Sequence, residues 1–275
     1  MRSQDDHHRE LTAPTGARED PEVEEAFERL LDEGEQRLHR PLVPLIATGL
    51  LGGIDVAVGV LTYLVVDART GDPLLASLAF TIGFVALLLG HSELFTENFL
   101  VPVTAVAARC GTVVELLRLW ALTLVTNLVG GFAMAWMTVV ALPEVRESAR
   151  VAGSHYAHLG VSARSFFLAV LAGAVITLLT RMQHGTESTG VKLAAAVAMS
   201  FVLVGAQLFH SVLDSILMFA GLLAGQADYT YADWFGALVW SAFGNLVGGL
   251  VLVTAIRLLR VTHRVAESRA EGQTG

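Results

Sequence analysis

Charged side chains are scarce in this chain: only 16% of its 275 residues are Asp, Glu, Lys or Arg, whereas 53% are hydrophobic. This balance disfavours a soluble globular domain and is typical of a polytopic membrane protein. The acidity is concentrated at the N-terminus, because residues 1–40 hold twelve acidic and six basic side chains and so account for −6 of the net charge of −8. The rest of the chain is nearly neutral, and no surface for a nucleic acid is expected.

Cysteine and catalytic motifs are also lacking. The single cysteine, Cys110, excludes an internal disulfide. The first 40 residues are polar and the first apolar run is too long for a signal-peptide core, so no cleavable signal is expected. His91 and Ser92 are only sequence neighbours, and Asp55 and Asp214 lie in no protease-type motif, which disfavours an intramembrane hydrolase. We therefore expect no enzymatic activity, no metal and no cofactor.

Long apolar runs dominate the sequence. Six of them are long enough to cross the bilayer as helices: 41–66, 74–106, 112–141, 164–182, 190–225 and 233–259. The second and fifth are too long for one straight helix and are interrupted by polar residues, His91-Ser92-Glu93 in one and His210-Ser211 with Asp214 in the other. We expect both to be discontinuous helices whose freed backbone lines a cavity inside the protein.

The apolar region contains an internal repeat. His91-Ser92 recurs 119 residues later as His210-Ser211, and the Asn-Leu-Val-Gly-Gly of 127–131 recurs 118 residues later at 245–249. Three spans per copy is an odd number, so the second copy enters the membrane from the opposite side. The sequence therefore predicts an all-α polytopic membrane protein with six transmembrane helices arranged as two inverted three-helix repeats.

The distribution of arginine and lysine predicts the orientation. Eleven of these residues flank the spans on the side of the N-terminus and four on the other side, which favours two cytoplasmic termini and a multi-pass protein of the inner (plasma) membrane. We expect a disordered cytoplasmic tail at 1–20, an amphipathic cytoplasmic helix at 21–40, a pore domain at 41–262 and a second cytoplasmic tail at 263–275.

Polar residues inside the spans are the candidate functional residues. A mid-membrane imidazole at His210 donates and accepts hydrogen bonds, so it can hold a small anion or pass it a proton. The alternative is a histidine that only joins two helices. Thr96 follows the first break and can offer its hydroxyl to the same cavity, unless it bonds its own helix. Asn127 and Asn245 are expected to cap backbone freed by the breaks, while their glycines allow close helix packing.

Several of these motifs together resemble the formate/nitrite transporter family. The resemblance covers about residues 22–262 and is carried by Leu94-Phe95-Thr96 at a helix break, by His210-Ser211, and by the Gly-Asn-Leu-Val-Gly-Gly of 244–249. It is closest to a less characterised branch whose loop reads Leu-Phe-Thr-Glu-Asn, as at 94–98. The acidic segment at 32–36, which precedes the first span, is similar to that branch as well.

The resemblance implies an aquaporin-like fold and a homopentamer in the lipid bilayer, with one pore in each protomer. It implies passage of small monovalent anions such as formate, nitrite, acetate or hydrosulfide, by a channel or by proton-linked transport. It places Leu94 and Ser211 beside the pore centre and hydrophobic constrictions at Phe80, Phe84 and Leu203. Thr177 falls where many members carry an asparagine near the histidine, and its hydroxyl can bond the imidazole.

Three acidic residues depart from the better-known members of this family. Glu97, Asp214 and Asp55 would repel anions if they faced the pore as carboxylates, so they pair with arginines such as Arg118 or Arg181, or the substrate differs. An aquaporin-like pore for a small neutral solute is the alternative that these acids favour. The sequence leaves open the identity of the anion and the role of His91.

Overall fold

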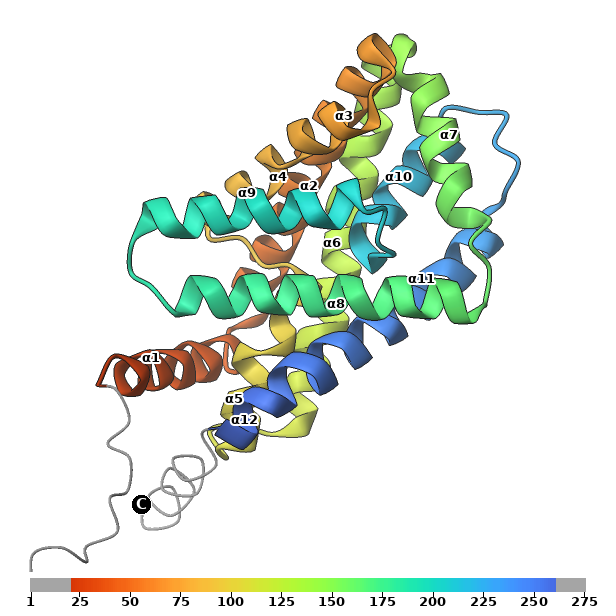
Figure 1. The fold of residues 1–275 in the computed structure, drawn as a ribbon. Helices are drawn as coiled ribbons and strands as arrows, with labels where there is room; N and C mark the ends of the chain where they lie inside the picture. The colour runs from red at the N-terminus through yellow and green to blue at the C-terminus, as the bar shows by residue number, and fades with distance from the viewer. Residues whose placement is uncertain (1–20, 261–275) are drawn as a thin grey trace, which may run out of the picture.

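The computed structural model describes residues 21–260, which are helical throughout, with short connections and no strand in that range (Figure 1). Five helical stretches are long and apolar enough to cross a membrane. Shorter apolar helices lie at Phe95–Ala107, Thr189–Gly205 and Ser211–Leu223. The prediction of an all-α polytopic fold with interrupted second and fifth spans is confirmed. The two tails predicted at 1–20 and 263–275 lie outside the described residues.

The first repeat begins with an unbroken helix and ends with another. Its elements are α2 (Leu42–Thr70), α3 (Pro73–Phe80), α4 (Ile82–Gly90), η1 (Phe95–Phe99), α5 (Val101–Ala107) and α6 (Val113–Ala141). Asp72 accepts hydrogen bonds from the first two free backbone N–H groups of α3, and Thr112 forms a capping box with Glu115 at the start of α6. The break between α4 and η1 spans residues 91–94, where His91 adopts a left-handed backbone conformation.

The second repeat follows the same plan. Its elements are α8 (Ala163–His184), α9 (Thr189–Gly205), α10 (Ser211–Leu223), α11 (Tyr231–Val247), a π-helical turn η3 (Gly248–Ala255) and α12 (Ile256–Arg260). Ser162 and Thr230 begin α8 and α11 with capping boxes. The break between α9 and α10 spans residues 206–210, so each repeat contains one helix that stops and restarts inside the bundle.

Two helices lie outside the repeats, at opposite ends of the bundle (Figure 1). The first is α1 (Pro21–Leu38), which packs on α5 through Leu30 and through close contact at Gly34. The second is α7 (Arg146–Ala157), preceded by the short turn η2 (Pro143–Val145) and packed on α10. Sequence analysis did not predict α7, because its mixed polar composition carries no signal of membrane insertion.

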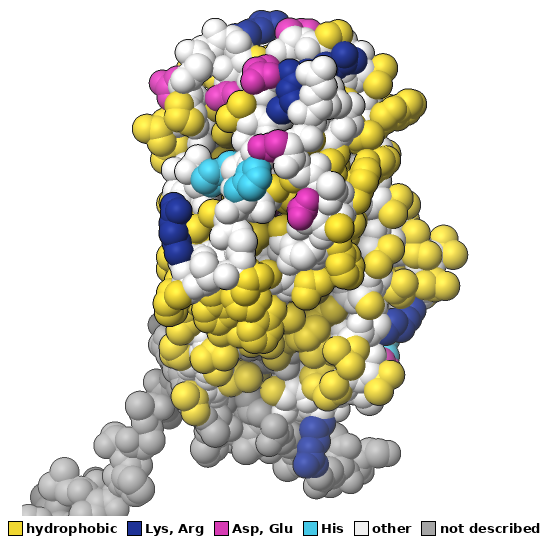
Figure 2. Space-filling view, turned by 90° about the vertical axis from the view of Figure 1, so that its right-hand side faces the viewer, with side chains coloured by type: hydrophobic (Ala, Val, Ile, Leu, Met, Phe, Trp, Pro, Cys, Tyr) yellow, Lys and Arg dark blue, Asp and Glu magenta, His cyan; other side chains and the backbone are white. Residues whose placement is uncertain are grey.

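The outer surface suits a lipid environment. Large hydrophobic side chains are exposed along the long helices, among them Leu51, Leu78, Val129, Phe167 and Phe243. Figure 2 shows such side chains over the lower part and one side of a face of the molecule, with most of the charged side chains toward its upper end. Leu258 of α12 packs against Phe27 of α1, so the described chain begins and ends at the same end of the bundle.

The asparagine of each repeat ties its break to the two unbroken helices. In the first repeat, Asn127 Oδ1 accepts the Phe95 N–H at 2.9 Å, while its Nδ2 donates to the carbonyls of Glu93 (2.8 Å) and Gly49 (2.7 Å). All three backbone groups belong to other elements than α6. A single buried amide therefore satisfies the backbone that the break leaves free.

Asn245 makes the same three contacts in the second repeat. Its Oδ1 accepts the Ser211 N–H, and its Nδ2 donates to the carbonyls of Phe209 and Ala169, each at 2.9 Å. The residue between the two bonded loop positions is Leu94 in one repeat and His210 in the other. His210 therefore corresponds to Leu94, and the correspondence with His91 suggested by the His-Ser echo is wrong by one helical turn.

Candidate functional site

The two breaks meet at a hydrogen bond in the middle of the bundle. Thr96 Oγ1 lies 2.8 Å from His210 Nε2, and both residues are completely buried. The His210 side chain also caps α10, because its Nδ1 accepts the Leu213 N–H at 3.1 Å. Since Nδ1 is an acceptor, the neutral ring carries its proton on Nε2 and donates it to Thr96. The Thr96 hydroxyl proton is then available to a third partner.

Four apolar residues expected beside the pore are buried in one hydrophobic cluster. Phe80 and Phe84 lie next to each other, with ring centroids 5.9 Å apart, and the cluster also contains Leu203, the third predicted constriction residue, and Leu94. None of the four is more than 1% exposed. An unhydrated ion in such surroundings is costly, so the polar groups of the pair are the groups that can replace water.

The other two predicted site residues make different contacts. Thr177 is buried, but its hydroxyl donates to the Gly173 carbonyl of its own helix at 2.8 Å. The expected hydrogen bond to the His210 imidazole is therefore not made, because a threonine mid-helix can bond the preceding turn where an asparagine would extend away. Ser211 uses its backbone N–H for Asn245, and its buried hydroxyl is unpaired within the described part of the chain.

A hollow of about 680 Å³ opens between α1 and the ends of α4 and α8, which we call the α1-side hollow. Its lining is strongly charged: Arg29, Glu33, Arg37, Arg40, Glu93, Glu97, Glu187 and Lys192, with His91 and His184. His91 is exposed there and lies away from the buried pair. Because Glu97 lines this hollow and is the neighbour of Thr96, the hollow extends to the first break.

Helix α1 is attached to this hollow by a polar network. Glu33 receives hydrogen bonds from Arg37 and, at 2.9 Å, lies against His184 Nε2 of α8. Burial alone would raise the pKa of the Glu33 carboxyl, but His184 and Arg37 outweigh it and hold that pKa well below its usual range. Arg37 Nη1 also donates to Asn98 Oδ1 at 3.0 Å, so α1 contacts η1 directly.

The acidic residues near the first break lie close to arginines other than those predicted. Glu93 is 3% exposed at its side chain and pairs with Arg40, while Arg37 acts electrostatically on Glu97. Arg118 donates instead to the Arg40 carbonyl. The predicted pairing of Glu97, Asp214 and Asp55 with Arg118 or Arg181 is wrong for the described residues: the arginine that acts on Glu97 comes from α1, and Asp55 and Asp214 have no arginine partner.

Substitution of Arg40 by methionine is expected to destabilise the protein by about 3–5 kcal/mol, because it leaves the Glu93 carboxylate buried without its cation. Thermal unfolding of purified protein in detergent measures the loss. The double variant Arg40→Met with Glu93→Gln removes both charges and is the control, since most of the stability should return. Equal stability of the single variant and the wild type would contradict the importance of this pair.

A second hollow, of about 490 Å³, lies at the opposite end, between α7 and the ends of α2 and α9; we call it the α7-side hollow. Its lining includes Tyr156, Leu217 and Val204, which is the neighbour of the predicted constriction residue Leu203. Tyr63, Asp67 and His155 supply polar groups. The Thr96–His210 pair thus lies between two hollows that open at opposite ends of the bundle.

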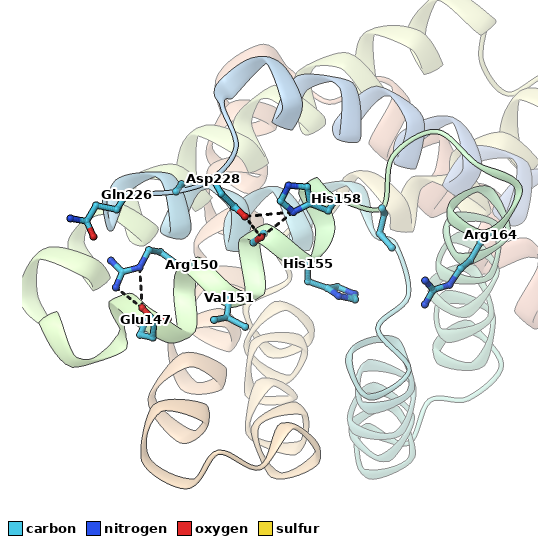
Figure 3. Close-up of a pocket in the computed structure, with 11 residues that line it drawn as sticks. Glu147, Arg150, Val151, His155, His158, Arg164, Gln226 and Asp228 are labelled. Atoms are coloured by element: carbon cyan, nitrogen blue, oxygen red, sulfur yellow. Dashed lines mark hydrogen bonds and ion pairs between the residues drawn. The ribbon is translucent and has the colours of Figure 1, made fainter.

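A shallower pocket lies beside the α7-side hollow (Figure 3). His155 of α7 and Arg164 of α8 extend toward each other across it, while Arg150 pairs with Glu147 and His158 lies 3.9 Å from Asp228. Burial, together with the charge of Arg164, lowers the pKa of His155. His155 and Val151 line both this pocket and the α7-side hollow, so the two spaces share a wall. Sequence analysis missed this cluster because α7 was not predicted.

Comparisons with known proteins agree with the sequence motifs. A family model described as "Formate/nitrite transporter" matches residues 24–259. The chain is 26% identical to "Uncharacterized transporter YrhG" of Bacillus subtilis (strain 168), over 90% of this chain and 96% of that protein. It is 25% identical to "Formate channel BtFdhC" of Bacillus thuringiensis, over 82% and 90% of the two chains.

Two solved structures share the fold. An "FNT family ion channel" superposes with a TM-score of 0.79 at 18% identity, covering 86% of this chain and 99% of the other. A "Pentameric formate channel with formate bound" superposes with a TM-score of 0.67 at 20% identity, covering 80% and 97%. These similarities extend over both repeats.

Proposed function

This chain belongs to the formate/nitrite transporter family, and we propose that it passes small monovalent anions of the formate, nitrite, acetate or hydrosulfide type through a pore within each protomer. The observation that carries this proposal is the Thr96–His210 hydrogen bond at the junction of the two breaks. This polar contact is completely buried in a bundle that has a hollow at each end and whose expected constriction residues, Phe80, Phe84 and Leu203, are buried as well.

The proposed path has three steps. Basic side chains attract the anion at either end: Arg29, Arg37, Arg40 and Lys192 in the α1-side hollow, and Arg164 beside the α7-side hollow. The anion next loses its hydration at Phe80, Phe84 and Leu203. Hydrogen bonds from His210 Nε2 and the Thr96 hydroxyl replace part of that hydration. Protonation to a neutral acid lowers the remaining cost.

The assembly and orientation belong to the same proposal. The exposed apolar side chains of the long helices offer surface for a homopentamer, which is how one of the solved relatives is described. The excess of arginine and lysine near α1 supports cytoplasmic termini in the inner membrane, with α7 on the outer side. A detergent-corrected mass of the purified protein tests the pentamer.

Uptake into liposomes tests the function. Vesicles containing the protein should take up formate, nitrite or acetate at least tenfold faster than empty vesicles, and faster still when the acidic side is the donor side. Stopped-flow swelling with glycerol in the same vesicles tests the alternative of a neutral-solute pore. Rapid glycerol swelling without any anion uptake would overturn the proposed function.

A further inference from the structure

Asp214 occupies the first turn of α10 directly behind the central histidine. It is 1% exposed, and its Oδ2 accepts the His210 backbone N–H at 2.6 Å. Its Oδ1 is also buried and has no hydrogen-bond partner among residues 21–260. The cap of α10 gives a reason for the buried position of Oδ2, but not for that of Oδ1.

The surroundings of Asp214 contain no counter-charge in the described part of the chain. Burial and the His210 N–H are the influences that act on its carboxyl. Two tyrosines lie on this side: Tyr156 of α7 interacts electrostatically with Asp214, and the Tyr229 hydroxyl is occupied by the Met218 carbonyl. An ionised carboxylate with a bare oxygen is costly in the membrane interior, whereas a carboxylic acid with its proton on Oδ1 needs no cation.

His210 itself is a poor source of a proton in this geometry. Its Nδ1 lone pair is taken up by the Leu213 N–H, so the ring has a single proton, on Nε2. Loss of that proton would leave an imidazolate anion. A second proton on Nδ1 would point at the Leu213 N–H and break the cap of α10. His210 can thus donate a hydrogen bond to an anion, but a transferred proton has to come from another group.

The α7-side hollow gives Asp214 a route to water. Leu217 is three residues further along α10 and so lies on the same face of the helix. Leu217 and Tyr156 both line the hollow, and so does Tyr63, with which Tyr156 also interacts. The hollow is therefore lined by two residues that neighbour Asp214, one along α10 and one on α7.

We propose that Asp214 holds a proton as a carboxylic acid and donates it from Oδ1 to the anion bound at Thr96 and His210. This rests on the proposed function. The O–H bond of Asp214 breaks and an O–H bond forms on the anion, so an acid and an anion become a carboxylate and a neutral acid. The neutral acid crosses the constriction and releases its proton to water beyond it. The Asp214 carboxylate then takes a proton from hydronium that enters through the α7-side hollow, which leaves a water molecule, so that one proton moves with each anion.

This role selects a class of substrate. Anions of weak acids, and monocarboxylates above all, have basicity close to that of an aspartate, so the proton moves between them at small cost. Anions of strong acids, such as nitrate or chloride, cannot accept it. The protein should therefore use a pH gradient to concentrate formate or acetate but not nitrate.

The test is Asp214→Asn, whose amide oxygen still accepts the His210 N–H but which has no proton to release. In proteoliposomes, uptake of formate driven by a pH gradient should fall at least tenfold. Nitrate uptake driven by membrane potential should stay within about twofold of wild type. Asp55→Asn is the matched control, because it removes a second membrane carboxyl, one that also has a buried oxygen without a hydrogen-bond partner among the described residues but belongs to α2 of the first repeat, and should leave pH-driven formate uptake unchanged.

Infrared spectroscopy of the wild type tests protonation independently of transport. A carboxylic-acid carbonyl band at neutral pH should shift when aspartate is isotope-labelled, should persist in Asp55→Asn, and should be lost in Asp214→Asn. Absence of that band, or unchanged pH-driven formate uptake in Asp214→Asn, would overturn the donor role alone. Absence of any anion uptake by intact wild-type protein would overturn the proposed function and the donor role together.

Discussion

Replacement of Asn245 by leucine should prevent accumulation of folded protein. The side chain makes three hydrogen bonds, to the Ser211 N–H and to the carbonyls of Phe209 and Ala169, all buried. Each backbone group left without a partner costs about 1–3 kcal/mol. The sum of roughly 3–9 kcal/mol approaches the whole stability of a typical protein, about 5–15 kcal/mol. Size-exclusion chromatography of the detergent-solubilised protein measures the folded yield.

The same helix supplies the control. Ser241 lies one turn before Asn245 and is equally buried, but its hydroxyl bonds only the Ala237 and Leu238 carbonyls of its own helix. Ser241→Ala should therefore leave the folded yield close to wild type. Asn127→Leu should repeat the loss in the first repeat, because it frees the matching groups of Phe95, Glu93 and Gly49. A normal yield of Asn245→Leu would show that other groups or water satisfy the break.

The sequence predicts the overall fold because long apolar runs indicate the membrane spans and a repeated motif indicates the two repeats. Membrane thickness fixes the length of a span, and backbone that leaves a helix inside the membrane needs a polar partner. The repeated asparagines were therefore recognisable as capping groups. The first glycine of each repeated motif packs on backbone, because a Cβ atom on Gly130 would overlap the Leu50 carbonyl oxygen and one on Gly248 would overlap that of Val170.

The details that the sequence did not predict are those that depend on tertiary contacts. The His-Ser echo suggested a match of His91 with His210, whereas the asparagine contacts match His210 with Leu94. Pairing of Glu93 with Arg40 joins residues 53 positions apart, at the ends of different elements. The polar helix α7 lies outside the membrane spans, so neither apolar length nor repetition indicates it, although it supplies Tyr156 and His155 to one hollow.

Substitution at the central pair should produce two different defects. In Thr96→Val the volume is nearly unchanged, but His210 Nε2–H loses its acceptor and the anion loses a hydroxyl donor. The cost of about 1–3 kcal/mol corresponds to a slowing of anion uptake by roughly fivefold to 150-fold. No leak is expected, because Phe80, Phe84 and Leu203 still close the path. Liposome uptake of formate, with nitrate current in parallel, measures both properties.

His210→Asn should instead leave space for water beside Thr96. Asparagine is a good N-cap, so α10 should still begin at Ser211, but the shorter amide cannot span the distance to Thr96 and leaves the volume of the ring empty. Water entering that space lowers the cost of an unprotonated anion. We therefore expect the pH-driven component of formate uptake to fall at least tenfold while nitrate current persists or rises. If this variant, correctly assembled, keeps the wild-type pH dependence and nitrate current, then His210 only joins two helices and the anion path lies elsewhere.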